Sequence, residues 1–136
     1  METGHSDVTT GGIRVRVAAQ LHGGDHAPGQ QMFVYAYKVV IENVGVERAR
    51  LISRHWIVRD ANGETREVKG PGVVGENPDL APGESFEYVS GCHLVTEWGT
   101  MEGTYRMRRP DGTEFDARIG RFFLAPNAAP ITAMEG

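Results

Sequence analysis

The sequence has little cysteine and no long apolar run. Cys92 is the sole cysteine among 136 residues, so no disulfide can form within the chain. This agrees with a reducing compartment. No apolar stretch approaches the roughly 20 residues that a membrane-spanning helix needs. The first residues, METGHSDVTTGG, have neither the basic start nor the apolar segment of a signal peptide. We therefore expect a cytoplasmic protein with no membrane partner.

The sequence also lacks a large excess of charges of one sign, and it lacks the spacing of apolar residues that is typical of a helix. The formal net charge is −4, which gives no overall attraction to nucleic acid, and we expect no nucleic-acid partner. Five arginines gather in the last third of the chain, and we interpret them as solvated strand faces: Arg106, Arg108, Arg109, Arg118 and Arg121. No window of about a dozen residues carries the 3.6-residue apolar stripe of an amphipathic helix.

The pattern that dominates is alternation. Apolar residues from Ile13 to Leu21 occupy every second position, as in a half-buried strand. The dipeptide Asn62-Gly63 and the segment Pro110-Asp111-Gly112 are turn signals between apolar segments. The sequence predicts strands near residues 13–21, 32–43, 50–59, 64–69, 85–92, 101–108 and 114–124. Seven short strands with regular turns indicate an all-β sandwich of antiparallel strands.

The length fits one domain, and neither a repeat nor a low-complexity tract interrupts the pattern. We expect the domain to span residues 13–126. Residues 1–12 are expected to form a disordered tail and residues 127–136 a loose one.

Residues 70–75, GPGVVG, match the G-x-G-x-x-G pattern of dinucleotide-binding loops. In those proteins a helix begins at the loop, and its N-terminal end receives the phosphates. Here the next segment contains Pro78 and Pro82, and proline inside a helix costs about 3 kcal/mol. A dinucleotide-binding fold is therefore excluded.

Two interpretations of this glycine loop remain open. We favour the first, in which glycines permit tight bends in a connection between sheets. In the second, successive N–H groups form a concave nest for phosphate or pyrophosphate. That anion site would use Lys69, Gly70, Gly72, Val73, Val74 and Gly75. On this second hypothesis, Gly72→Ala weakens anion binding and leaves the fold largely intact.

Other groups that suggest chemistry have simpler explanations. His22, Asp25 and His26 could bind a divalent metal. Ordering this glycine-rich segment would cost about 1–2 kcal/mol per residue, so we expect a solvated loop. Cys92 and His93 are adjacent in a strand and point to opposite faces, which excludes a nucleophile and its base. We expect no metal, no cofactor and no catalytic residue.

The strand around Trp56 has no cleanly polar face. We interpret Trp56 as a core anchor because an indole buries a large area. Arg54, if near the core, needs a partner such as a carboxylate or the carbonyl groups of the glycine loop.

Phe122 and Phe123 are consecutive, so one of them should face outward and could mark a partner surface. A free sheet edge could accept a strand from another chain, which would give a homodimer or a peptide complex.

Three segments together resemble the bacterial ApaG proteins: ISRHWIVRDANG at 52–63, EVKGPGVVGENPDLAPGESFEYVSGC at 67–92 and GTMEGTYRM at 99–107. The resemblance covers about residues 13–126. It implies a fibronectin type III-like sandwich and a glycine loop for which pyrophosphate binding has been suggested. It also implies no established catalytic residue and a link to cobalt resistance and magnesium efflux.

Similar domains in a eukaryotic F-box protein and in a DNA-polymerase-delta-interacting protein look like modules for binding other proteins. We therefore expect a non-enzymatic protein-interaction module with a protein partner. The alternative is a sensor of phosphate, pyrophosphate or nucleotide that uses the glycine loop.

Overall fold

The computed structural model describes residues 4–27 and 30–126, and for residues 23–27 and 30–31 it describes the backbone alone. These residues form nine strands and no helix: β1 (His5–Thr10), β2 (Ile13–Ala27), β3 (Gln30–Asn43), β4 (Ala49–Asp60), β5 (Thr65–Pro71), β6 (Asp79–Leu80), β7 (Ser85–Leu94), β8 (Gly99–Arg108) and β9 (Glu114–Leu124). All pairings are antiparallel. The predicted all-β class is confirmed, and the described residues contain no helix that could cross a bilayer.

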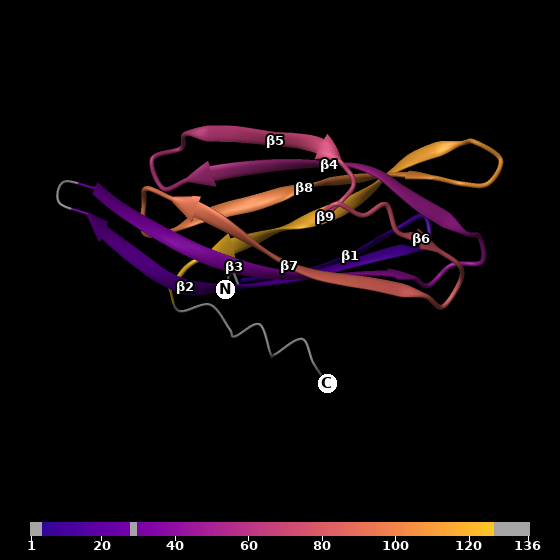
Figure 1. Cartoon of the computed structure of the whole chain (residues 1–136), viewed down its shortest axis with the longest axis horizontal. Helices are drawn as coiled ribbons and strands as arrows, with labels where there is room; N and C mark the ends of the chain where they lie inside the picture. The colour runs from indigo at the N-terminus through magenta and orange to yellow at the C-terminus, as the bar shows by residue number, and fades with distance from the viewer. Residues whose placement is uncertain (1–3, 28–29, 127–136) are drawn as a thin grey trace.

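The strands form two sheets that pack face to face (Figure 1). One sheet has the order β1-β2-β3-β7, and the other has the order β5-β4-β8-β9 with β6 paired to β4. The turn at Asn62-Gly63 joins β4 to β5, and the turn around Asp111 joins β8 to β9, as predicted. The seven expected strands are all present, and β1 and β6 are additional.

The expected disordered tail is wrong for residues 5–10, which form β1. This strand pairs with β2, with Val8 opposite Val15. Gly11 and Gly12 make the turn between the two strands with φ angles of 56° and 83°. Consecutive positive φ angles are what a two-residue hairpin turn requires, so the glycine pair turns the chain back into the sheet. Residues 127–136 lie outside the described residues.

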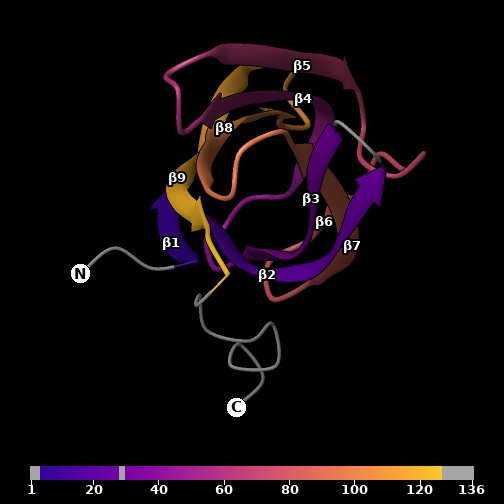
Figure 2. The same cartoon turned by 90° about the vertical axis from the view of Figure 1, so that its left-hand side faces the viewer.

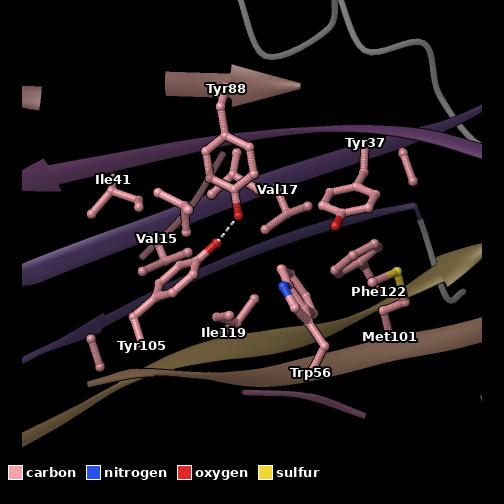
Figure 3. Close-up of a cluster of buried hydrophobic side chains, with 14 of the residues drawn as sticks. Val15, Val17, Tyr37, Ile41, Trp56, Tyr88, Met101, Tyr105, Ile119 and Phe122 are labelled. Carbon is pink, nitrogen blue, oxygen red and sulfur yellow. Dashed lines mark hydrogen bonds between the residues drawn. The ribbon is translucent and has the colours of Figure 1, made fainter. Parts of the chain in front are cut away.

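The core lies between the sheets and is centred on Trp56, which is 2% exposed. Its ring makes edge contacts with Tyr37, Tyr105 and Phe122 at centroid distances of 5.4, 6.2 and 6.0 Å. Figure 3 shows these rings together with the hydrogen bond between the hydroxyl groups of Tyr88 and Tyr105. The prediction that Trp56 anchors the core is confirmed.

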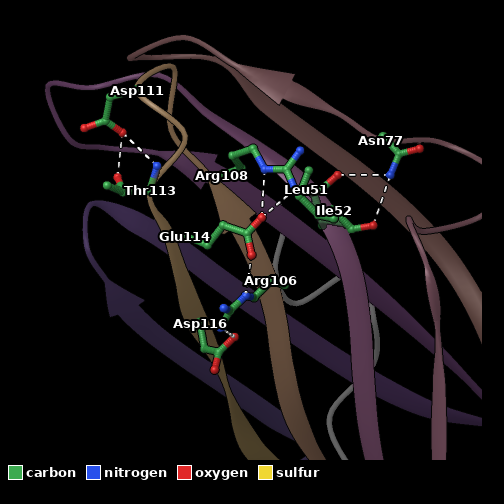
Figure 4. Close-up of polar contacts among 9 residues, drawn as sticks. All are labelled: Leu51, Ile52, Asn77, Arg106, Arg108, Asp111, Thr113, Glu114 and Asp116. Carbon is green, nitrogen blue, oxygen red and sulfur yellow. Dashed lines mark hydrogen bonds and ion pairs between the residues drawn. The ribbon is translucent and has the colours of Figure 1, made fainter.

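A β-bulge in β4 explains its mixed pattern. The register with β8 shifts between Leu51 and Ser53. An extra residue reverses the alternation, so Leu51 lies on the same inner face as Trp56 although they are five positions apart. Asn77 donates hydrogen bonds to the carbonyl oxygens of Leu51 and Ile52 at 3.1 and 3.2 Å, which holds the bulge (Figure 4). The bulge places Arg54 on the inner face too.

The two long sides of the sandwich differ (Figure 2). On one side, β1 and β2 pack against β9 and join the two sheets. On the other side, β5 and β7 are the outermost strands of their sheets. No described strand pairs with the outer edge of either one. This open side of the sandwich is called the β5/β7 side below.

Candidate functional site

The glycine loop is a tight turn between β5 and the segment that leads to β6. The N–H of Val73 donates to the carbonyl of Glu76 at 2.8 Å, and the N–H of Glu76 donates back to the carbonyl of Val73 at 2.8 Å. Between them, Val74 and Gly75 have φ angles of 45° and 81°. Gly72 also has a positive φ, 60°, and a Cβ there would lie 2.3 Å from the carbonyl oxygen of Glu76. Gly72 and Gly75 therefore allow the chain to bend tightly, as the favoured interpretation predicts.

The loop uses most of its N–H groups within the protein. Besides the two bonds of this turn, the N–H of Gly72 donates to the carbonyl of Ile52 at 2.9 Å. The side chain of Val73 is 1% exposed and belongs to the core. Of residues 72–76, Val74 and Gly75 alone keep N–H groups without a partner among the described residues. A nest needs consecutive free N–H groups, and the N–H groups of Gly72 and Val73 are already bonded within the protein. Val74 and Gly75 are the consecutive pair that remains, and the anion site stays a prediction.

Carbonyl oxygens of this loop, rather than N–H groups, face a charged side chain. Arg54 Nη1 donates to the carbonyl oxygens of Pro71 and Gly72 at 2.9 and 3.0 Å. Gly70 has no side chain, and its ideal Cβ position would lie 3.0 Å from both Nη1 and Nη2 of Arg54. The hypothesis that Arg54 bonds the glycine-loop carbonyls is confirmed. Lys69 is exposed and lies opposite His55 in the register of β4 and β5, on the outer face of the sheet.

A second arginine crosses the β5/β7 side. Arg66, on β5, donates from Nη2 to the carbonyl oxygen of His93 at 2.7 Å and to Cys92 Sγ at 3.4 Å, both on β7. No ion pair of the described residues involves Arg54 or Arg66. Two guanidinium groups therefore face this side of the sandwich without a carboxylate partner.

These arginines line a cavity of about 210 Å³ between the sheets. Tyr37, Ser90 and Cys92 contribute its other polar groups, and Trp56 and Val68 contribute apolar surface. Burial raises the pKa of the Tyr37 hydroxyl, and the Ser90 hydrogen bond opposes this. Burial also raises the pKa of the Cys92 thiol, against the opposing effect of Arg66. Both groups are therefore neutral near pH 7, and the charge of the cavity is positive.

Three of the arginines near the end of the chain have local partners. Arg106 forms ion pairs with Glu114 at 2.9 Å and Asp116 at 3.2 Å, and Arg108 pairs with the same Glu114 at 2.6 Å (Figure 4). Arg109 lies over the ring of Phe115, with its Cζ 4.4 Å from the centroid. These pairs agree with the interpretation of solvated strand faces, because the carboxylates neutralise the positive charge.

The other candidates do not come together as a site. Among the described residues, no group of three His, Cys, Asp or Glu side chains could hold a metal ion. The expected loop is wrong here, because residues 23–27 continue β2 and pair with β3. His22 is exposed at the irregularity of β2 between Leu21 and Gly23, and the side chains of Asp25 and His26 lie outside the described residues. Cys92 is buried and His93 is exposed, as the alternation of a strand predicts.

Sequence reasoning did not select Arg66 and Val68. They alternate with Gly70 along β5, and all three pair with the inward-facing residues of β4. The alternation is visible in the sequence, but every residue from Thr65 to Lys69 is exposed. Only the neighbouring strand shows which of the two faces of β5 is the inner one.

Comparison with known proteins assigns the family. The ApaG domain model matches residues 24–109. The chain is similar to Protein ApaG of Thiobacillus denitrificans, with 56% identity over 72% of this chain and 77% of that one. It is also 51% identical to Protein ApaG of Anaeromyxobacter dehalogenans, over 88% of this chain and 94% of the relative.

A solved structure agrees. The crystal structure of a protein from Bordetella pertussis, described as ApaA, matches with a TM-score of 0.80 and 41% identity over 95% of this chain and 100% of that chain. The chain belongs to the ApaG domain family.

Proposed function

We propose that this protein is a non-enzymatic interaction module that binds an extended segment of a partner protein along the outer edge of β5. One observation carries the proposal. Val68 pairs with the buried Trp56 and faces inward, yet it remains 40% exposed. In the opposite sheet, β7 lines the same cavity but leaves Val68 partly uncovered. An uncovered inner face beside a free edge is suited to an added strand, which gains backbone hydrogen bonds and buries alternate side chains.

Further apolar surface supports this location. A second cavity, of about 250 Å³, lies on the same side and is lined by Val58, Arg66, Leu94 and Val95, among others. Val95 is 62% exposed. An extended segment on β5 would therefore meet apolar side chains beyond Val68.

The partner is a different protein in this proposal, and a second copy of this chain is the competing occupant. We expect the binding to take place in the cytoplasm. The link to cobalt resistance and magnesium efflux, which the family resemblance implies, would then be exerted through the partner rather than through metal bound by this chain.

The test compares two variants that carry the same substitution. Val68→Lys places a charge on the inner face of the β5 edge, which opposes strand addition. Val46→Lys is the control, because Val46 is 92% exposed in the loop between β3 and β4. Each protein is immobilised and used to capture partners from a cell lysate. We expect the wild type and Val46→Lys to retain one protein that Val68→Lys loses.

Equal capture by all three proteins would remove β5 from the proposal, and the absence of any specific protein would contradict the interaction function. Sedimentation of the purified wild-type chain measures whether it forms a dimer, and so tests whether a second copy of the chain occupies the β5 edge. A dimer that Val68→Lys dissociates would make the second copy the partner.

A further inference from the structure

We infer that the segment bound at β5 carries two acidic side chains four residues apart with an apolar side chain midway, and that Arg54 and Arg66 receive the two carboxylates. The inference rests on the proposed function. It adds the chemistry of the partner, which neither the family assignment nor the fold provides.

The inner face of β5 presents three positions in a row. Arg66 pairs with Val58, Val68 with Trp56, and Gly70 with Arg54. Cross-strand partners share a face, so Arg66, Val68 and Gly70 all face inward. Successive inward positions are two residues apart, and the full set spans roughly 13 Å at the rise of a strand.

A strand added to β5 would place its inward side chains opposite these three positions, with Cβ atoms about 4.5–5.5 Å away. The side chain opposite Gly70 would meet no β5 side chain, and the nearest charged group would be the Arg54 guanidinium that covers this glycine. The side chain opposite Val68 would lie beside an apolar residue that is 40% exposed. The side chain opposite Arg66 would lie beside a guanidinium.

Both guanidinium groups have hydrogen-bonding capacity left. Arg54 uses Nη1 for the two loop carbonyls, and Arg66 uses Nη2 for its contacts on β7. In each residue the Nε and the other Nη have no partner among the described residues. Arginine bonds carboxylates with two parallel N–H groups, and such charge-assisted bonds are stronger than neutral ones.

Charge also limits where the acidic residues can lie. Asp60 and Glu64 stand at the β4–β5 turn and line the neighbouring cavity with Arg66. Glu67 lies on the outer face and accepts a hydrogen bond from His55 Nε2 at 2.6 Å. Along the inner face, positive charge therefore lies between Arg66 and Arg54, and an acidic residue placed beyond Arg66 would be repelled by Asp60 and Glu64.

The test uses defined peptides. The probe is acetyl-Thr-Glu-Thr-Val-Thr-Glu-Thr-amide, and its control replaces both glutamates by glutamine. Glutarate is the third arm, because it carries two carboxylates and no backbone that can pair. Each is titrated into 15N-labelled protein. We expect saturable amide shifts along β5 with the acidic peptide, at least tenfold weaker binding of the glutamine peptide, and no saturable shifts with glutarate.

Arg66→Gln should abolish most of the preference for the acidic peptide, whereas Arg59→Gln should keep it. Arg59 is the matched control because it is an exposed arginine on the outer face of β4, next to Val58. We choose Arg66 rather than Arg54 for the substitution because the Arg54 side chain also holds the glycine loop through its hydrogen bonds.

The outcomes separate the two proposals. Equal binding of both peptides to β5 would overturn the acidic specificity and leave the interaction edge intact. Binding of glutarate as tight as that of the acidic peptide would overturn the role of strand addition. No binding of any probe would overturn the inference, while the capture experiment with Val68→Lys would still decide the proposed function.

Discussion

The substitution Gly72→Ala tests how tightly the glycine loop is packed, through its effect on the free energy of unfolding. We expect Gly72→Ala to destabilise the fold strongly, in contrast to the expectation from the sequence that the fold would stay largely intact. An alanine Cβ at this position would lie 2.3 Å from the carbonyl oxygen of Glu76, where real Cβ contacts essentially never fall under 3.0 Å. The backbone around Glu76 must therefore move.

The magnitude follows from two contributions. An alanine with φ near 60° adopts a left-handed conformation at roughly 1–2 kcal/mol. Moving Glu76 breaks the reciprocal pair of hydrogen bonds with Val73, each of which contributes about 1 kcal/mol. Together these give a loss of about 3–4 kcal/mol in the free energy of unfolding. Gly75→Ala is the matched control, because Gly75 also has a positive φ but nothing lies within 4 Å of its Cβ position. It should lose only about 1–2 kcal/mol.

Urea unfolding followed by tryptophan fluorescence measures both values, since Trp56 leaves the core on unfolding. If Gly72→Ala and Gly75→Ala destabilise the protein equally, the close approach of Glu76 does not restrict the loop, and the reasoning is refuted.

Two more predictions concern the loop and the core. Titration of 15N-labelled protein with pyrophosphate or ATP should give no saturable shifts confined to residues 69–76, because the N–H groups of Gly72 and Val73 are already bonded; such shifts would restore the phosphate-sensor hypothesis. Phe122→Ala should cost about 3–5 kcal/mol of unfolding free energy, since Phe122 is fully buried. Phe123→Ala should cost less than half as much, because Phe123 stacks on the half-exposed Trp98; equal losses in urea unfolding would contradict this assignment of the two faces.

Much of the fold could be predicted from local patterns. Alternation located the main strands that have one face in the core and one in solvent, whereas β5 is exposed along most of its length. Turn residues located the hairpins at Asn62-Gly63 and around Asp111. The core role of Trp56 and the partners of Arg54 were also predictable, since a large indole seeks burial and a guanidinium near the core needs acceptors.

Other features were not predictable in the same way. Residues 5–10 have a weak strand pattern, and β1 exists because Gly11-Gly12 returns the chain to an edge of β2. The bulge in β4 reverses the face of Leu51 relative to Trp56, and a strictly alternating pattern cannot show such a reversal.

The sequence by itself determined the class of the fold and the chemistry of its strands, because alternation and turn preference depend on neighbouring residues. Tertiary structure alone decided which edge stays free. Val68 stays 40% exposed because β5 is the outermost strand of its sheet and β7 of the opposite sheet covers it only in part. Arg54 meets the glycine loop because β4 and β5 pair in one register. Both facts depend on the packing of strands far apart in the chain, which local patterns do not encode.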